Sequence, residues 1–589
     1  MKPLPAQPLY FGPEGSRLFG WLHLPAPEAR RGLGVVVCNP FGFEEVCAHR
    51  SLRQFAMVFS AAGWPSLRFD HAGCGDSEGD EFEPDVPARW LAGVNAAIDT
   101  LKAAGGVQQV VLFGVRLGAT LAALAGMGRD DVGGLVSIAP VVRGRGYIRE
   151  LTMLGQGGST AAVSRADVLE SAGFVMTRAT EEHLSQLDLR RLPKAPAPRV
   201  LIIPRDDLED GLDWQTSLKA LGADVQVERL PGYADMMQDP QRTVPPQLMM
   251  EGVIRRVQMW DDALALRPVV PVASAGAEVL RLPADAVTER PVHIATSASS
   301  AIFGVLTEPE GTLPQRGRPA VLMLNSGAVH HIGPNRLWTR LARQWAARGV
   351  TVLRIDLSGV GDSPARPGAP ENVVYSAHAM QDVTDALAYL RGELGADECH
   401  LLGLCSGGYH AFKAAVAGQP VVSSTVINPL TYFWHDGDTL RDVKDYELAE
   451  LTSRYRDKVF TREPWLKLLR GQLDARVIVQ VGLRRTWGHI EPYLLRLARR
   501  LRIPLQDDLA DELSQAVRQG IRLRFVFAAR APGYDLLRKQ GGSAIDRLIE
   551  RQLASLDFVP DADHTFTRLE ARERLVALLD RLAPVSRAA

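Results

Sequence analysis

Residues 35–77 begin VVVCNPFGFEE and end RFDHAGCGDS, and residues 321–363 begin VLMLNSGAVHH and end RIDLSGVGDS. The two stretches align without a gap, and 13 of their 43 positions are identical. Such self-similarity indicates that one structural unit occurs twice. In each half, short apolar runs such as 109–113 alternate with amphipathic stretches such as 337–348. This alternation is typical of a mostly parallel sheet flanked by helices, so the sequence predicts two copies of one α/β fold.

The boundary between the copies is predicted from a change in composition. Residues 266–288 lack hydrophobic periodicity and are rich in proline, alanine and valine, as linkers are. We therefore predict a first domain over 1–265, a linker over 266–288 and a second domain over 289–589. In the second domain, about 90 residues separate Pro429 from the apolar run at 523–527. This length is unusual for a connection and predicts a helical cap over about 431–520.

The composition limits the class of protein and its partners. Hydrophobic residues make up 46% of the chain and charged residues 23%, as in globular rather than disordered proteins. The net charge of -1 gives no overall attraction to nucleic acid or an anionic membrane, and there is no apolar run long enough for a membrane span. The five cysteines are scattered, without the CxxC spacing of a metal site, and the N-terminal residues resemble no signal peptide. We expect a cytoplasmic protein without a nucleic-acid partner, a membrane span or a cofactor.

A strand-to-helix turn in the second copy holds the candidate nucleophile. Residues 403–408 read Gly-Leu-Cys-Ser-Gly-Gly, so small residues flank Cys405. The chain also has D-x-x-G-x-G-D-S turns at 70–77 and 356–363 and a late Asp-His-Thr-Phe segment at 563–566. On these motifs the chain resembles the α/β-hydrolase superfamily over nearly its whole length, twice. More narrowly, it is similar to the serine-aminopeptidase-like (S33-type) hydrolases found near bacterial exopolysaccharide and exosortase gene sets.

The resemblance implies that Cys405 is the nucleophile, in a G-x-Nu-x-G turn that pushes this side chain out of the backbone. A nucleophile at Ser406 would instead put Leu404 where the turn requires glycine. A thiol at this position is similar to the arrangement in dienelactone hydrolases. The alternative interpretation is a cysteine that packs as a small hydrophobic residue.

His564 is the implied base, because the superfamily histidine follows the last strand and precedes the terminal helix. A carboxylate that orients the imidazole is expected just past the strand at 523–527. Ala531 occupies that place, which leaves Asp535 as the nearby substitute and Asp563 as a weaker one. A cysteine–histidine pair can also form without a third member.

The oxyanion hole is implied to combine two backbone N–H groups. One belongs to Ser406, the residue after the nucleophile, and the other to Ala328 in the loop after the early strand. His330 and His331 follow that loop and could reach substrate or a metal, or lie on the surface. Two adjacent histidines without a third ligand are a weak metal signal, so we assign no metal.

The first copy departs from the pattern at both decisive positions. Its turn reads Gly-Val-Arg-Leu-Gly, so Arg116 replaces the nucleophile, and Asp235 stands where His564 stands in the second copy. A permanently charged guanidinium cannot attack a carbonyl. Asp206 and Asp207 follow a strand and are candidates to pair with Arg116. We predict a catalytically inactive copy, interpreted either as a scaffold for the second copy or as an anion-binding site.

The sequence thus predicts an α/β-fold hydrolase of carboxylic ester or thioester bonds, or an acyltransferase, that acts through an S-acyl intermediate on Cys405. Its expected substrate is a small-molecule ester or a carrier-bound acyl group. The alternative hypothesis is a non-catalytic binding or assembly protein of a cell-envelope or exopolysaccharide pathway, favoured by the lost nucleophile in the first copy and the uncertain acid in the second.

Overall fold

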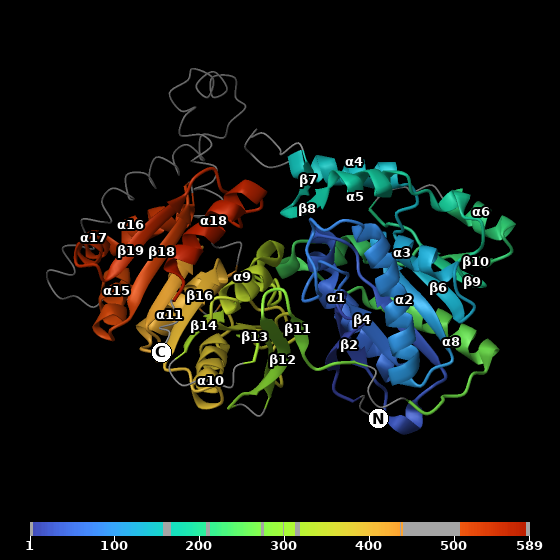
Figure 1. The fold of residues 1–589 in the computed structure, drawn as a ribbon, viewed down its shortest axis with the longest axis horizontal. Coiled ribbons are helices and arrows are strands. Elements are labelled where there is room, and N and C mark those ends of the chain that lie inside the picture. The colour runs from blue at the N-terminus through green and yellow to red at the C-terminus, as the bar shows by residue number, and fades with distance from the viewer. Residues whose placement is uncertain are drawn as a thin grey trace, which may run out of the picture.

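The protein consists of two α/β lobes side by side, one from each copy of the repeat (Figure 1). The computed structural model describes residues 4–156, 167–207, 213–271, 276–297, 300–311, 318–435, 437–439, 507–529 and 531–584. The first lobe runs from blue to green in Figure 1 and the second from yellow-green to red. The predicted duplication of a mostly parallel sheet flanked by helices is confirmed.

The first sheet has the strand order β1-β2-β4-β3-β5-β6-β9-β10. β2 pairs antiparallel with β1 and β4, and the other neighbours pair in parallel. The strands are Gln7–Phe11 (β1), Leu18–His23 (β2), Leu33–Cys38 (β3), Ser66–Phe69 (β4), Gln109–Val115 (β5), Val132–Ile138 (β6), Arg199–Ile203 (β9) and Asp224–Val227 (β10). A separate hairpin is formed by Val168–Ser171 (β7) and Phe174–Thr177 (β8).

The second sheet has the order β11-β12-β13-β15-β14-β16-β17-β18-β19. Apart from the short edge strand β11, this order repeats that of the first sheet, and β13 is again antiparallel to both its neighbours. The strands are Leu280–Leu282 (β11), Val287–Ala295 (β12), Ala301–Pro309 (β13), Pro319–Met323 (β14), Thr351–Ile355 (β15), Glu398–Leu404 (β16), Ser423–Ile427 (β17), Arg522–Ala528 (β18) and Ala554–Val559 (β19).

Helices cover both faces of each sheet. In the first lobe they are Phe43–Ala61 (α1), Val86–Gly105 (α2), Leu117–Gly126 (α3), Gly144–Gln156 (α4), Arg178–Ser185 (α5), Asp213–Ala220 (α6), Tyr233–Met236 (α7) and Gln247–Leu264 (α8). In the second they are Leu337–Ala346 (α9), Ala379–Gly392 (α10), Ser406–Val416 (α11), Leu509–Arg518 (α15), Pro532–Gly541 (α16), Ser543–Glu550 (α17) and Leu569–Leu582 (α18). Short 3-10 helices lie at Pro27–Ala29 (η1), Leu189–Arg191 (η2), Pro240–Arg242 (η3) and Pro334–Arg336 (η4).

The strand β3 shows why both faces need helices. Successive side chains of a strand point to opposite faces, and all of β3 is buried. Val35 and Val37 belong to a core with α1 and α8, whereas Val36 and Cys38 belong to a core with α2 and α3. A continuous apolar strand of this kind is stable only in the middle of a sheet that is covered on both sides.

An apolar contact joins the two lobes through equivalent strands, β2 and β13. The ring centroids of Trp21 and Phe303 lie 4.6 Å apart, and both side chains are buried. Phe19, Val305 and Ala346 of α9 belong to the same buried cluster. Because this cluster draws on both copies, the lobes share a core.

Two buried ion pairs cross the same interface reciprocally. Nη1 of Arg354 in β15 donates to Oδ1 of Asp76, 2.6 Å away. Arg68 of β4 pairs in the same way with Asp362. Arg68 and Arg354 are equivalent positions of the repeat, and so are Asp76 and Asp362. Reciprocal use of one residue pair is the geometry of a twofold interface, here formed within a single chain.

Arg336 adds a contact that the repeat does not duplicate. Its guanidinium donates to the backbone carbonyls of Gly73, Gly75, Ser77 and Gly79. These carbonyls belong to the D-x-x-G-x-G-D-S turn of the first copy and its continuation. The turn therefore presents its oxygens to the other lobe.

Two predicted segments differ from the structure. The predicted linker, 266–288, contains β11 and the first two residues of β12. The strand residues at 280–282 are too few for their alternation to stand out in the sequence. The predicted cap, about 431–520, includes α15, whose Leu509 and Leu513 are buried in the core of the second lobe and which packs beside α11, α16 and α17. Residues 440–506 of the predicted cap lie outside the described residues.

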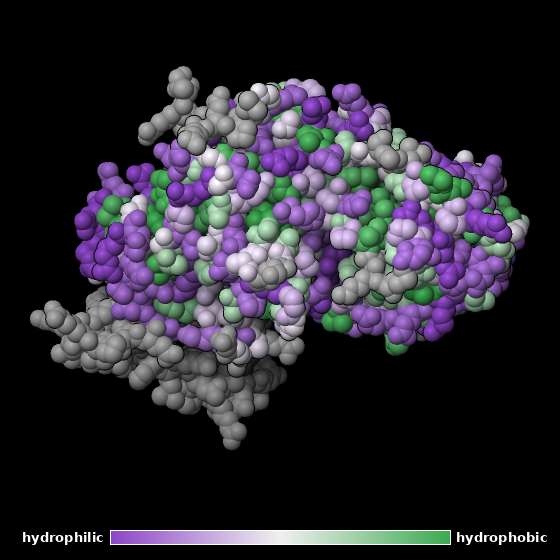
Figure 2. All heavy atoms as spheres, turned by 90° about the horizontal axis from the view of Figure 1, so that it is seen from below, coloured by the Kyte–Doolittle hydropathy of each residue, from purple (hydrophilic) through white to green (hydrophobic). Residues whose placement is uncertain are grey.

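Among the described residues, no helix has the length and apolarity needed to cross a membrane. On the face shown in Figure 2, hydrophobic and hydrophilic residues are interspersed over both lobes.

Candidate active site

The predicted elbow in the second copy has the expected backbone. Cys405 lies between β16 and α11 with φ 59° and ψ −118°, and its N–H donates to the carbonyl of Ile427 on β17 over 2.9 Å. A positive φ is costly for a residue with a side chain, and such strain concentrates at functional sites. Ser406 is instead the first residue of α11. The residue at the apex of the turn is therefore Cys405.

The flanking glycines are required by close approach of the backbone. A Cβ on Gly403 would lie 2.0 Å from the carbonyl oxygen of Gly407, and a Cβ on Gly407 would lie 2.5 Å from that of Asn325. Neither contact is compatible with a side chain. The small residues of the motif thus allow β16, α11 and the Asn325 loop to converge at Cys405.

The environment of Cys405 favours the neutral thiol. Burial raises the pKa of Cys405 to about 12, although the N–H of Ser406 acts in the opposite direction. The side chain is 8% exposed. A thiol in this state needs a base to become a nucleophile.

His564 lies in the loop between β19 and α18, as expected from the sequence. Asn428, which directly follows β17, holds this loop: its Nδ2 donates to the carbonyl of His564 over 2.8 Å, and its Oδ1 accepts the N–H of Ala528. Because Cys405 bonds to the neighbouring Ile427, the histidine loop is tied to the strand end beside the elbow. Burial lowers the pKa of His564 to about 4, which leaves a neutral imidazole at neutral pH.

The two candidate acids have different surroundings. Asp535 is exposed in the first turn of α16, which begins just after β18. Asp563 accepts the N–H of Thr567 over 2.8 Å and also contacts its hydroxyl, so it supports the turn after the histidine. Ala531, at the position where the sequence led us to expect an aspartate, is buried.

The two backbone donors predicted for an oxyanion hole lie on segments that contact each other. The N–H of Gly327 donates to the hydroxyl of Ser406 over 2.9 Å, which holds the Asn325 loop against the start of α11. The N–H of Ser406 is directed at Cys405. Within the described residues the N–H of Ala328 makes no hydrogen bond, so it remains available as a donor.

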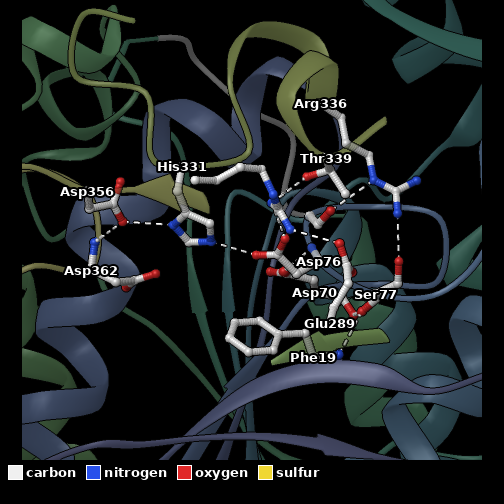
Figure 3. Close-up of polar contacts among 12 residues, drawn as sticks. Phe19, Asp70, Asp76, Ser77, Glu289, His331, Arg336, Thr339, Asp356 and Asp362 are labelled. Atoms are coloured by element: carbon white, nitrogen blue, oxygen red, sulfur yellow. Dashed lines mark hydrogen bonds and ion pairs between the residues drawn. The ribbon is translucent and has the colours of Figure 1, made fainter. Parts of the chain in front are cut away.

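His330 and His331 are buried between the lobes. The ring of His330 stacks on His49 at 4.0 Å. Nδ1 of His331 lies 2.8 Å from Asp356, and Nε2 lies 2.6 Å from Asp76 of the other copy (Figure 3).

A neutral imidazole has only one N–H, so the two carboxylates around His331 favour the protonated ring. Burial alone would lower the pKa of His331, but Asp356 and Asp76 raise it to about 10. His331, Asp356 and Asp362 bring possible ligand atoms within 4.8 Å of one another. All three already have ionic or hydrogen-bonded partners, so we assign them to the interface rather than to a metal.

Sequence reasoning missed an aromatic group beside the elbow. Tyr375 packs against the first turns of α11, with its ring 5.1 Å from that of Tyr409 and stacked on Trp434 at 4.2 Å. Its buried hydroxyl has no hydrogen-bond partner among the described residues. Burial and the neighbouring Cys405 raise the pKa of Tyr375. Tyr375 and Trp434 lie in loops outside the motifs, so no sequence signal indicated them.

The elbow of the first copy keeps the strained backbone without a nucleophile. Arg116 has φ 52° and ψ −122°, close to the values of Cys405, and its N–H bonds to the carbonyl of Ile138. Its guanidinium pairs with Glu44, at 2.7 Å, and with Glu150. These carboxylates differ from Asp206 and Asp207, the partners suggested by the sequence. Burial would lower the pKa of Arg116, but Glu44 and its neighbours raise it, so the side chain stays charged.

Asp206 has a structural task instead. Its carboxylate accepts the backbone N–H groups of Gly232, Tyr233 and Ala234 over 2.6 to 3.1 Å. It thus fixes the loop that corresponds to the histidine loop of the second copy. Asp235, which replaces the histidine, is exposed.

The sheet order and the two strained elbows define an α/β-hydrolase architecture that is present twice in one chain. A family model described as the alpha/beta hydrolase family matches residues 321–578, and one described as serine aminopeptidase, S33, matches residues 36–190. The chain therefore belongs to the α/β-hydrolase superfamily of enzymes, with two tandem domains. The predicted superfamily is confirmed, and S33-type similarity is found in the first copy.

No curated protein matches the chain. Solved structures similar to it include Est1E from Butyrivibrio proteoclasticus with ferulic acid bound, at 18% identity and a TM-score of 0.34, covering 43% of this chain and 99% of that one. GrgF from Penicillium sp. sh18 is 18% identical, with a TM-score of 0.30 and coverage of 51% and 99%. A proline iminopeptidase from Mycobacterium smegmatis is 16% identical, with a TM-score of 0.31 and coverage of 44% and 99%.

Proposed function

We propose that the second copy hydrolyses carboxylic ester or thioester bonds, or transfers their acyl groups, through a covalent intermediate on Cys405. The observation that carries this proposal is the strained backbone at Cys405, which a merely structural cysteine would not require. The position at the start of α11 also places the thiol at the positive end of the helix dipole, next to the N–H of Ser406.

In the first half-reaction, His564 takes the proton of the Cys405 thiol as the sulfur attacks the acyl carbonyl. The same proton passes to the leaving alcohol or thiol when its bond to the acyl carbon breaks. In the second half-reaction, His564 takes a proton from water or an acceptor alcohol, which attacks the S-acyl carbon, and Cys405 leaves and regains a proton. Burial lowers the pKa of His564 to about 4, so the imidazole is neutral at neutral pH and has a nitrogen lone pair to accept a proton, although the same shift makes it a weaker base than a free imidazole.

The negative charge that develops on the carbonyl oxygen needs fixed donors. We assign this task to the backbone N–H groups of Ser406 and Ala328. The bond from Gly327 to the Ser406 hydroxyl supports the assignment, because it holds the two segments together. Preorganised donors of this kind are worth about 3 kcal/mol each in related chemistry.

Asp535 remains the proposed third member. Asp563 is engaged with Thr567, and Asp535 follows β18 within the first turn of α16. Since Asp535 is exposed, solvent screens its charge, and its effect on the imidazole is expected to be smaller than that of a buried triad acid.

The decisive experiment measures turnover of short-chain p-nitrophenyl esters and acyl thioesters together with intact-mass detection of an acyl adduct. The variants are Cys405→Ala and His564→Ala. The matched control is Cys399→Ala, because Cys399 is a buried cysteine near the start of β16, the strand that ends just before Cys405. We expect an adduct on the wild type and the control that is lost in Cys405→Ala, and turnover reduced at least about 1000-fold in both site variants.

Full turnover by Cys405→Ala would refute the proposal. Absence of both turnover and adduct in the wild type would favour the non-catalytic binding or assembly protein instead.

A further inference from the structure

A pocket of about 410 Å³ lies at the elbow of the first copy. Its lining comes from the ends of β6 and β9 and from α4 and α6, which stand over that edge of the sheet (Figure 1). The walls include the apolar side chains of Val141, Ile202 and Trp214. The charged residues that line the pocket are Arg116, Arg143, Glu150, Arg205 and Asp213. This volume is within the range of small-molecule sites. The first copy has lost its nucleophile but has kept a pocket in front of it.

A carboxylate of the protein itself, that of Glu150, lies within ion-pair distance of two arginines of this pocket. Glu150 of α4 contacts Arg116 and lies 3.6 Å from Nη1 of Arg205. Its side chain is 45% exposed, whereas that of Arg116 is 5% exposed. Arg116 is held from the other side by Glu44, and Arg205 by Asp207 at 2.7 Å. Each arginine thus has a second carboxylate partner, and Glu150 is the most exposed of the three carboxylates.

A second, independent feature indicates a ligand. Trp214 lines the pocket and is 1% exposed, yet its indole N–H has no acceptor among the described residues. A buried donor without a partner is costly, and a bound acceptor group would remove that cost.

The strained backbone of Arg116 is a third feature. A positive φ is costly for a residue with a side chain and persists only where the surroundings impose it. With arginine at the apex, that strain does not serve nucleophilic attack. The strained backbone instead places Arg116 in the wall of the pocket, at the position that the nucleophile occupies in an active α/β hydrolase.

We propose that this pocket binds a small carboxylic acid, whose carboxylate displaces Glu150 from between Arg116 and Arg205. The exchange of one carboxylate for another leaves the charge of the cluster unchanged, whereas a phosphate dianion would add a negative charge next to Glu44 and Asp207. The planar guanidinium groups suit a carboxylate. The body of the ligand lies along Trp214 and Ile202, with an oxygen that accepts the indole N–H.

The test is a binding titration of the full chain, by calorimetry, with acetate, butyrate and 4-hydroxybenzoate. 4-Hydroxybenzamide serves as the neutral counterpart, and inorganic phosphate as the competing anion. The variants are Glu150→Gln, which removes the internal competitor, and Arg205→Gln. Glu228→Gln is the matched control, because Glu228 pairs with Arg256 elsewhere on the same lobe.

We expect at least one carboxylate to bind, about tenfold more tightly to Glu150→Gln than to the wild type, and at least about tenfold more weakly to Arg205→Gln. The control should match the wild type. The proposal is overturned if Glu150→Gln binds no more tightly, if the amide binds as well as the acid, if phosphate binds more tightly than every carboxylate, or if none of the three acids binds either protein at about 10 mM. None of these results depends on activity at Cys405.

Discussion

Substitution of Asp76 by asparagine tests the reciprocal interface. The carboxylate of Asp76 accepts from Arg354 and His331, each over 2.6 Å, and is 1% exposed. Asparagine keeps the shape but loses the charge. Each charge-assisted hydrogen bond is worth about 1.5–3 kcal/mol, and a buried ion pair broken from one side costs about 3–5 kcal/mol. Arg354 retains its bond to Glu289 at 3.0 Å. We therefore expect the free energy of unfolding to fall by about 3 kcal/mol, the lower end of the range for a broken buried ion pair.

Urea unfolding of the full chain, followed by tryptophan fluorescence, measures this loss as a shift of the transition in which the lobes separate or unfold. Asp362→Asn should cost a similar amount, because Asp362 is the equivalent residue opposite Arg68. Glu228→Gln removes a more exposed ion pair and should cost less than about 1 kcal/mol. If Asp76→Asn costs no more than this control, the buried pairs do not hold the lobes together and the reasoning is refuted.

Two further predictions concern pH. Because the folded pKa of His331 is raised from 6.5 to about 10, its contribution to stability is complete below pH 6.5 and is lost as the pH rises through 10. The free energy of unfolding should fall in that window by at most about 1.4 kcal/mol per pH unit, and less in His331→Asn; equal slopes would contradict the assignment. Because burial lowers the pKa of His564 to about 4, kcat/KM for the ester substrates should keep its value down to about pH 4. A fall in kcat/KM below about pH 6.5 would mean either that the general base is not His564 or that its imidazole is exposed to solvent.

The sequence was sufficient for the features that depend on local spacing. Gly403 and Gly407 around Cys405 indicated the elbow, because backbone atoms approach these positions to within 2.5 Å and exclude a side chain. The duplication indicated that both lobes share one fold, and the two sheets do have matching strand orders apart from β11. Asn428 could also have been found, since it aligns with Ala139 at the same strand end and is polar in only one copy.

The contacts between distant segments were not predictable in this way. Glu44 and Glu150 lie 72 and 34 residues from Arg116, on helices whose rotation depends on packing. Asp206 and Asp207 are even farther from Arg116 in the sequence, and the expectation that they pair with it, which rested on their place after a strand, was wrong. The role of His331 could not be predicted for the same reason, because its partner Asp76 belongs to the other lobe and comes close only when the two lobes associate.

Loss of the nucleophile does not make the first copy dispensable to the second. Arg354 and Phe303 of the second copy are fully buried, and their partners Asp76 and Trp21 belong to the first. Without that lobe, an apolar face would be exposed and a buried arginine would lose a carboxylate. Arg116, by contrast, contacts Glu44 and Glu150 within its own lobe. The contacts between the lobes therefore use residues of the first copy other than those at its elbow, so arginine at the elbow is compatible with an intact interface.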